Sequence, residues 1–425
     1  MNPFKEKPLK KTVFETWDKL YPKSYDKRAV DPYTKTRIIL MNGTEFEANW
    51  FSHQFDRHVK NNELRRALAF TRSQEKRQQI KISMLKPKDE TVLEHTIGYE
   101  QLAVDLTAEL AKKEKNFNVK KALDFALLED FDHLYRYANK LEEEQGVHAE
   151  KLVGKYTEIM PGRPTIAHHR YPTDNVRKSI NNKTADKQSI LATMIITAAE
   201  QQTMNYYMNV ATFGNDDLSR RLYQEIALVE EEHVTQYESL IDTKGSWLEM
   251  LLWHEYCECY LYWSCYETET DKYIKDIWEE NFLTEVTHLH DACGLLKNYG
   301  KKDPEEVITD GKFPEPVSLH ENIEYVRKIL ADTVQFTSVD EDYEKIDNLP
   351  QNARFFVYGE CITPDVDMLA SHNVIENRIK VKGKDYRFEV AENPVEALRN
   401  RKQDNVKVGV KPDSAKSSGF EKNPK

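Results

Sequence analysis

Glycine and proline are scarce in this sequence, at 14 and 16 of 425 residues, whereas Glu, Lys, Leu and Ala are plentiful. Both residues interrupt helices, so their scarcity predicts a mainly helical protein. No apolar run approaches the roughly 20 residues of a membrane span, and the first residues lack the apolar core of a secretory signal. The five cysteines, an odd number, include no Cys-x-x-Cys pair. We therefore expect reduced thiols in a cytoplasmic protein that does not associate with a membrane.

Positive charge is also in deficit, with 61 Lys and Arg against 72 Asp and Glu, which gives a net charge of −11. The chain has no sustained basic stripe with interleaved aromatic residues, so the sequence predicts no nucleic-acid partner. Acidic side chains turned towards the inside of a helical bundle would contribute to such a balance. A chain of this length also has room for two or three domains.

The pattern along the chain predicts five regions. Residues 1–88 mix short apolar pieces with turn signals and a polar helix around 63–79, and we interpret them as an N-terminal extension. Residues 89–243 form a four-helix bundle with a long crossover at 144–186, and residues 244–300 form an additional helical hairpin. Residues 301–403 hold a helix and a small β-containing part, with strands at 353–358 and 378–390, and residues 404–425 form a disordered tail. The predicted helices cover about 90–113, 118–143, 187–212, 216–242, 246–270, 272–298 and 319–333.

Three predicted hairpins share one spacing of acids and histidine. A carboxylate is followed by another thirty residues later and by a histidine three residues beyond that. The three sets are Glu100, Asp130 and His133; Glu200, Glu230 and His233; and Glu255, Glu285 and His288. Side chains three apart lie on one face of a helix, so each acid-x-x-His pair can reach one site.

The acids of the first two sets interrupt apolar stripes. Glu100, for example, follows Leu93 and Ile97 and precedes Val104 in a helical rhythm of fours and threes. A carboxylate on such a face is buried, and a buried carboxylate needs a partner. Four of them at one level repel each other, and a pair of divalent cations would compensate for that repulsion. Alternatively, these acids form ion pairs inside the bundle or face the solvent.

In these motifs the chain resembles the ferritin-like superfamily, and the rubrerythrin branch has the most similar layout. The resemblance covers residues 90–242 and implies a ferritin-like four-helix bundle that binds two iron ions, with manganese as the alternative. It implies Glu100 and Glu200 as single-glutamate ligands, and Asp130 with His133 and Glu230 with His233 as paired ligands. The chain has Asp130 where the family has glutamate. It also has no four-cysteine rubredoxin module and hence no electron donor of its own.

The third hairpin permits more than one interpretation. Glu255, Glu285 and His288 could form a second metal site, or they could be a relic of duplication packed against the first four helices. The hairpin could also mediate a homodimer. We predict that its cysteines, including Cys257 and Cys265, are buried packing residues, and that its aromatic cluster belongs to the core. Tyr137 and Tyr237 lie one turn after the histidines and would either tune the centre or only pack beside it. His168 and His169, in the crossover, are expected to be exposed.

The resemblance implies an oxidoreductase. Its substrate would be peroxide, reduced in the rubrerythrin manner, or dioxygen, and an external donor would supply the electrons; oxidation of ferrous iron is a related activity. Two hypotheses from other classes remain. One is a non-catalytic metal-binding or storage bundle, and the other is a structural interaction protein whose bundle holds no metal.

Overall fold

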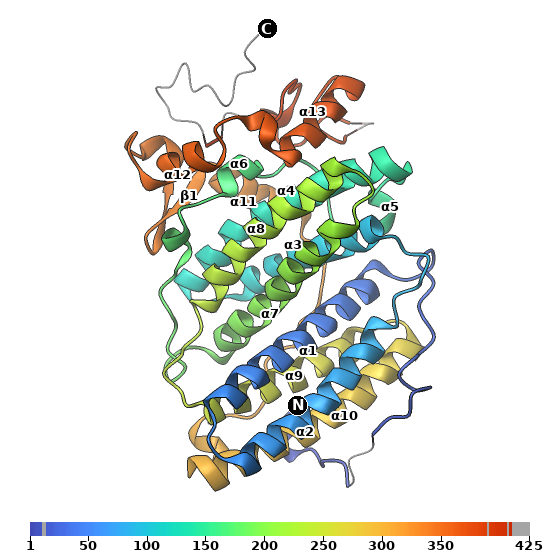
Figure 1. The fold of residues 1–425 in the computed structure, drawn as a ribbon, viewed down its shortest axis with the longest axis vertical. Coiled ribbons are helices and arrows are strands. Elements are labelled where there is room, and N and C mark those ends of the chain that lie inside the picture. The colour runs from blue at the N-terminus through green and yellow to red at the C-terminus, as the bar shows by residue number, and fades with distance from the viewer. Residues whose placement is uncertain (11–13, 389–390, 406–407, 410–425) are drawn as a thin grey trace. The chain divides into compact units, whose positions relative to one another are not determined.

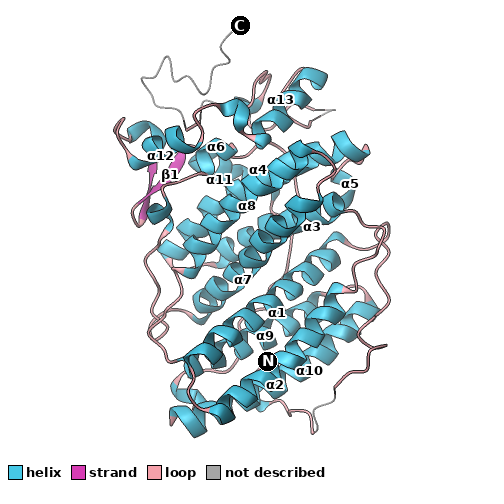
Figure 2. Ribbon diagram, in the orientation of Figure 1, coloured by secondary structure: helices cyan, strands magenta, loops and turns pink. Residues whose placement is uncertain are grey.

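The computed structural model describes residues 1–10, 14–388, 391–405 and 408–409. The fold is mainly helical, with one small antiparallel sheet of β1 (Phe336–Val339) and β2 (Asp342–Lys345), as Figure 2 shows. Phe336 pairs with Lys345, and Val339 pairs with Asp342 at the turn. In the described part of the chain, no helix combines the length and the apolar content that crossing a membrane would require.

Two compact units divide the chain. The first unit comprises residues 1–90, 180–202 and 241–319, and the second comprises 91–179, 203–240 and the described residues from 320 onwards. One helix, α7 (Lys187–Val210), belongs to both, because its residues up to Gln202 group with the first unit and the rest with the second.

The first unit is built from two helical hairpins, which Figure 1 draws in blue and in yellow. Their helices are α1 (Pro32–His58), α2 (Asn62–Ser83), α9 (Trp247–Thr268) and α10 (Lys272–Leu295). Helix α1 packs on α9 and α2 packs on α10, so four antiparallel helices share one interior. Each helix begins at a polar cap, namely Asp31, Asn61, Ser246 and Asp271, whose side-chain oxygen accepts a backbone N–H of the first turn.

The second unit contains α3 (Val92–Lys113), α4 (Phe117–Gln145), α8 (Asp217–Glu238) and the end of α7. Thr91 and Glu94 form a capping box at the start of α3, and Asn116 caps α4. Gly146, in the left-handed conformation, ends α4. These local signals explain why the helices predicted over 90–298 agree closely with the observed ones.

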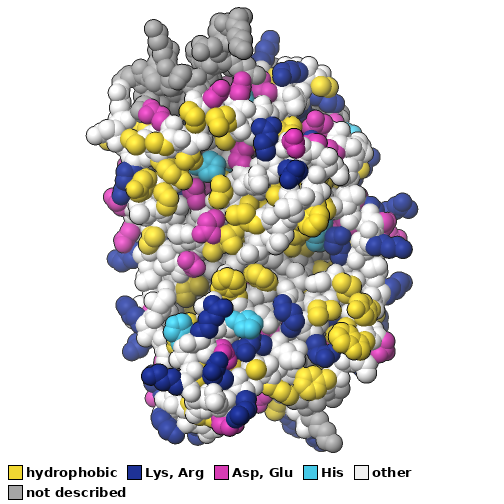
Figure 3. All heavy atoms as spheres, viewed as in Figure 1, with side chains coloured by type: hydrophobic (Ala, Val, Ile, Leu, Met, Phe, Trp, Pro, Cys, Tyr) yellow, Lys and Arg dark blue, Asp and Glu magenta, His cyan; other side chains and the backbone are white. Residues whose placement is uncertain are grey.

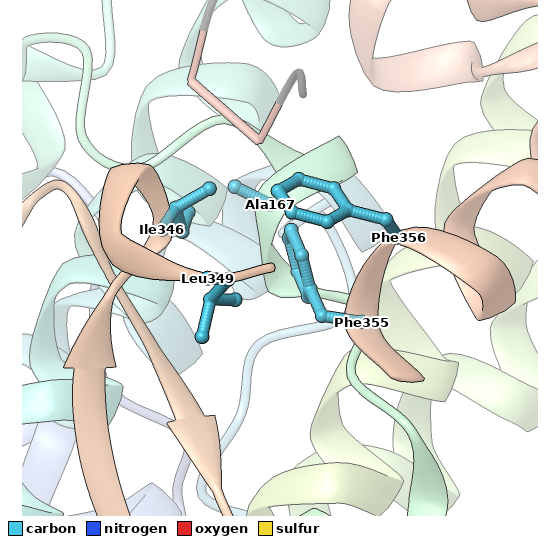
Figure 4. Close-up of a cluster of buried hydrophobic side chains, with 5 residues drawn as sticks. All are labelled: Ala167, Ile346, Leu349, Phe355 and Phe356. Atoms are coloured by element: carbon cyan, nitrogen blue, oxygen red, sulfur yellow. The ribbon is translucent and has the colours of Figure 1, made fainter. Parts of the chain in front are cut away.

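The rest of the second unit comprises the crossover and the C-terminal helices. The crossover holds the short helices α5 (Glu150–Val153) and α6 (Thr165–His168), and the C-terminal part holds α11 (Ile323–Thr333), α12 (Arg354–Ile362) and α13 (Ala370–Lys382). Figure 4 shows Ala167 of α6 packed against Ile346, Leu349, Phe355 and Phe356. This apolar cluster attaches the region after β2 to the crossover.

Two sequence predictions about the C-terminal region are wrong. Strands were expected at 353–358 and 378–390, but α12 covers 354–358 and α13 covers 378–382. Residues 383–388 form neither helix nor strand, and residues 389–390 lie outside the described part. The aromatic and β-branched residues there fit a strand locally, but the structure buries Phe355 and Phe356 from a helix against α6. Gly383, within the second of these ranges, ends α13 with positive φ. A small β-containing part does exist, at β1 and β2.

The predicted N-terminal extension and disordered tail also look different in the structure. Residues 1–88 contain the complete α1–α2 hairpin, whereas the sequence had indicated only a polar helix near 63–79. Most of the tail predicted at 404–425 lies outside the described residues. Asp404 and Asn405, at its start, are buried, each at 7% exposed.

The crossover approaches α4 closely at Gly162. Its N–H donates to Asp132 Oδ1 at 3.0 Å, and a Cβ added at Gly162 would lie 2.6 Å from the Leu128 carbonyl oxygen. Backbone atoms cannot move aside as the end of a flexible side chain can. Only glycine therefore fits this contact.

We predict that Gly162→Ala lowers the free energy of unfolding by about 1–3 kcal/mol, because the added methyl group pushes the crossover away from α4. Chemical denaturation measures the change. Gly245→Ala is the matched control, since its added Cβ would meet nothing closer than 3.6 Å, and we expect an effect within about 0.5 kcal/mol. Equal stability of the two variants would contradict the close contact.

Asp404 links the C-terminal segment to α4 through a buried ion pair. Its Oδ1 lies 2.9 Å from Arg136 Nη1, and its Oδ2 lies 3.2 Å from His372 Nδ1. Burial raises the pKa of Asp404, but Arg136 and His372 outweigh that effect and bring the pKa down to about 2. The ionised carboxylate therefore stabilises the folded state.

Asp404→Asn should lower the free energy of unfolding at pH 7 by about 2–3 kcal/mol, because it leaves Arg136 short of an anion. Asp404 has a lower pKa when folded than the ~3.9 of an unfolded Asp, so its contribution is complete above about pH 4 and disappears towards pH 2. Denaturation curves of both proteins from pH 7 to pH 2 should converge in acid. The same series on Asp332→Asn, at an exposed position, should show no such convergence.

Candidate metal centre

Five of the six side chains predicted as ligands meet inside the second unit. Glu100 comes from α3, Asp130 and His133 come from α4, and Glu230 and His233 come from α8. Each is at most 1% exposed. Helix geometry explains the pairing, since residues three apart on α4 and on α8 share a face.

Nitrogen and oxygen atoms of these side chains lie at short distances. His233 Nδ1 is 3.1 Å from Glu230 Oε2 and 3.3 Å from Asp130 Oδ1, and His133 Nδ1 is 2.9 Å from Glu230 Oε1. Ligand atoms of Asp130, Glu230 and His233 lie within 4.8 Å of one another, and so do those of Glu100, His133 and Glu230. Glu230 belongs to both groups, so one buried carboxylate is common to the two sets of candidate ligand atoms.

The charges within this cluster are unevenly compensated. Burial raises the pKa of Asp130, since the charged form loses its water. Burial acts on Glu230 too, but the two histidine rings outweigh it and lower the pKa to about 2. Neither oxygen of Asp130 has a hydrogen-bond partner among the described residues, although the side chain is fully buried. A buried carboxylate whose described ion-pair partner is a histidine ring rather than a lysine or arginine is poorly compensated, so this atom set fits a bound cation.

Glu129, one residue before Asp130, supports the cluster from outside. Its Oε1 lies 2.7 Å from Arg163 Nη1 and 2.6 Å from Arg170 Nη1, and its Oε2 lies 2.7 Å from His233 Nε2. Burial raises the pKa of Glu129, but Arg170 and its other partners hold it well below the usual range. With Nε2 bound to Glu129, His233 presents Nδ1 to Asp130 and Glu230, and a carboxylate behind a histidine is the usual outer support of a metal ligand.

This support was not predicted from the sequence. Glu129 lies off the apolar stripe of α4, and both arginines come from the crossover, whose fold the sequence did not predict. The available signal was the pair of arginines near Pro161 and Pro164 in an otherwise polar link. Buried arginines require an anion, so a carboxylate partner was to be expected once their burial was known.

Tyrosines cover the Glu100 side of the cluster. Tyr207, on α7, donates its hydroxyl to Glu100 Oε1 at 2.5 Å. Tyr137 packs 5.3 Å from Tyr207 and 4.9 Å from Tyr223 between ring centroids, and its buried hydroxyl has no hydrogen-bond partner among the described residues. Tyr237 lies 6.4 Å from His233 between ring centroids. Tyr137 and Tyr237 therefore pack beside the cluster, whereas Tyr207 makes a hydrogen bond to the Glu100 carboxylate.

The crossover histidines are buried, which corrects the expectation that they are exposed. His168 is 0% exposed, donates from Nε2 to the Arg163 carbonyl oxygen, and lies 5.2 Å from His133 between ring centroids. His169 is 8% exposed and lies 3.5 Å from Glu232. The crossover folds over α4 and α8 rather than remaining in solvent, so its polar sequence was misleading.

Glu200, the sixth predicted ligand, lies on α7 and is 1% exposed. It belongs to the part of α7 that groups with the first unit, three residues before the helix enters the second. Glu255, Glu285 and His288 lie in the first unit on α9 and α10, each at most 2% exposed. Cys257, Cys259 and Cys265 are free and buried there, as predicted, whereas Cys293 is only half-buried.

Charged side chains of both signs are mixed on the face drawn in Figure 3. The clusters of acidic side chains described above are instead inside the units, where each of these side chains is nearly inaccessible to solvent.

Comparison with known proteins gave no matching family model, no matching curated protein and no matching solved structure. The chemistry of the site therefore has to be argued from its own residues.

We predict that Glu129→Gln lowers the free energy of unfolding by about 3–5 kcal/mol, because two buried guanidinium groups lose their shared anion. Denaturation in the presence of a metal chelator measures this effect without any contribution from bound cations. Glu231→Gln, at an exposed position of α8, should change stability by less than about 0.5 kcal/mol. If Glu129→Gln were equally silent, the two arginines would have another source of charge.

Proposed function

We propose that the second unit is a non-haem two-metal carboxylate centre of ferritin-like type, an oxidoreductase that reduces peroxide or dioxygen. The observation that carries the proposal is the convergence of five predicted side chains, all buried, with Asp130 lacking any hydrogen-bond partner among the described residues. His233 and His133 both present Nδ1 to a carboxylate oxygen, which supports the proposal further.

Iron fits this set of donors best, with manganese as the alternative. Carboxylate oxygens together with one imidazole per cation suit these metals, whereas thiolate-seeking ions would require cysteine. Glu100, Asp130, His133, Glu230 and His233 would hold the two cations. When bound, the metals would supply the electrons for reducing an oxidant and a positive charge to bind it.

Glu200 is the sixth residue of the proposed ligand set, and a comparison with the other hairpins of the chain supports it. In the first unit its counterpart in the hairpin repeat is Glu255, whose carboxylate lies within 4.8 Å of ligand atoms of Glu75 and His288. Glu200 also precedes Tyr207 by seven residues, and residues seven apart share a face of a helix. We therefore propose that Glu200 is the single-glutamate ligand from α7.

The protein's own residues would position the ligands and protect the reaction. Glu129 fixes the ring of His233, and Tyr207 fixes the carboxylate of Glu100. The buried hydroxyl of Tyr137 is available to donate a proton near Glu100. Since the chain has no Cys-x-x-Cys pair, electrons would come from an external donor.

The first test is metal content. After loading with ferrous ion without oxygen, elemental analysis of the His133→Ala, His233→Ala double variant should show about two metal equivalents fewer than the unchanged chain. The control is His95→Ala, because His95 is a half-buried α3 residue in ring contact with Tyr99 and Tyr206 rather than with the cluster. Unchanged metal content in the double variant would refute the ligand assignment.

Turnover separates catalysis from storage. The iron-loaded chain, given peroxide and a chemical reductant, should consume peroxide repeatedly, and the double variant should lose that activity. A bundle that only stores metal would react once per loaded iron and then stop. A metal-free interaction protein would retain no iron at the first step.

A further inference from the structure

The α1–α2 hairpin carries the same spacing of polar residues as the other three. Glu45 is followed by Glu75 after thirty residues and by Gln78 three residues later, in the positions where Glu100, Asp130 and His133 stand in the second unit. This set differs from the other three in having glutamine, Gln78, at the position where they have histidine. The first unit therefore pairs two hairpins of one register, α1–α2 with α9–α10.

Five carboxylates and one histidine meet inside these four helices. Ligand atoms of Glu75, Glu255 and His288 lie within 4.8 Å of one another, and so do those of Glu255, Glu258 and Glu285. Glu255 belongs to both groups, as Glu230 does in the second unit. His288 Nδ1 lies 3.1 Å from Glu285 Oε2, the same distance as between His233 and Glu230.

The supporting contacts repeat as well. Tyr262 donates its hydroxyl to Glu45, as Tyr207 does to Glu100, and each tyrosine stands seven residues after the acid of its own helix. His288 Nε2 lies 3.3 Å from Gln74 Oε1, and Gln74 precedes Glu75 just as Glu129 precedes Asp130. The two units therefore have the same contacts among the acids and histidine and the same supporting contacts around them, which indicates that they contain the same kind of site.

The carboxylates of the first unit lack compensation from protein cations. Among the described residues their ion pairs involve His288 and no lysine or arginine. Glu258 is 2% exposed and neither of its oxygens has a hydrogen-bond partner, and one oxygen each of Glu45, Glu75 and Glu255 is in the same situation. Burial, together with neighbouring acids, raises the pKa of Glu258 well above its usual range. When all five carboxylates are ionised, they and the histidine carry four or five negative charges in total, which two divalent cations would nearly match.

We propose that the first unit holds a second two-cation centre, formed by Glu45, Glu75, Glu255, Glu258, Glu285 and His288, that prefers hard divalent cations such as Mn²⁺. This centre is separate from the one in the second unit and has its own set of helices.

Most of the candidate ligand atoms of this centre are oxygens, and this determines which metal ions it prefers. Gln78 replaces the second histidine, and its Nε2 donates to Glu285 Oε1 at 2.7 Å. Glu258 adds a carboxylate where the second unit has no acid, since the corresponding position on α3 is Ala103 and that on α7 is Thr203. A site with five carboxylates and one imidazole suits Mn²⁺ more than the nitrogen-preferring Cu²⁺ or Zn²⁺.

Glu258 also borders a cavity. A small cavity of about 10 Å³ is lined by Thr44, Glu47, Ala48, His254 and Glu258, among others. Glu47 pairs with His254 at 3.1 Å, and both side chains are partly exposed, at 20% and 16%. An acidic residue at the surface end of the cavity would attract a cation towards Glu258.

Mn²⁺ titration of the full chain in the His133→Ala, His233→Ala background tests the proposal, with free Mn²⁺ followed by electron paramagnetic resonance. We expect about two Mn²⁺ to remain bound per chain, and we expect them to be lost when Glu75→Gln and Glu258→Gln are added. Glu279→Gln, at an exposed position of α10, is the matched control and should retain both ions. Retention of both ions without Glu75 and Glu258, or no binding in the background, would overturn the second centre.

A melting experiment guards against a variant that fails to fold. With a chelator present, Glu258→Gln should melt at the same or a higher temperature than the unchanged chain, because a repelling buried charge is removed. With Mn²⁺ present, the background protein should melt at a higher temperature, and Glu258→Gln should lose most of that increase. A Glu258→Gln protein that keeps the full increase would also overturn the proposal. Neither result depends on the metal content or turnover of the second unit.

Discussion

Carboxylates buried between helices are the constraint on which the rest of the structure depends. A buried charge must be matched, and the second unit matches its acids in two ways. Glu129 receives the guanidinium groups of Arg163 and Arg170, so protein cations neutralise it permanently. Asp130 and Glu230 face histidine rings and have no arginine or lysine among their described ion-pair partners. The first arrangement is structural, whereas the second leaves negative charge for a cation to neutralise.

Local chemistry explains what could be predicted from the sequence. Helix ends between 90 and 298 were predictable because polar caps such as Asn116 stand directly before long apolar rhythms. The pairing of His133 with Asp130 follows from one turn of helix, and the burial of Glu100 follows from the apolar stripe around it. Each of these inferences needs only neighbours in the sequence, which is why the structure agrees with them.

What the sequence could not show depends on distant partners. The strands expected at 353–358 are helical because Phe355 and Phe356 pack against Ala167, almost two hundred residues away in the chain. His168 and His169 are buried because the polar crossover folds over two helices. The α1–α2 hairpin was interpreted as an extension because its histidine position holds Gln78. Which hairpin packs with which is also a tertiary property, and no local pattern in the chain indicates that α9–α10 packs with α1–α2.

The two units share a scaffold but differ in what stands behind the histidine, and this difference separates their proposed chemistry. A carboxylate such as Glu129, itself held by arginines, accepts the Nε2 proton of His233 strongly and makes the ring a better electron donor to a metal. Gln74 is neutral and makes a longer contact with His288, so it provides less of this effect. A centre that exchanges electrons with an oxidant gains from strong nitrogen donation. A centre with one weakly supported imidazole among five carboxylates is instead suited to holding a divalent cation without changing its charge.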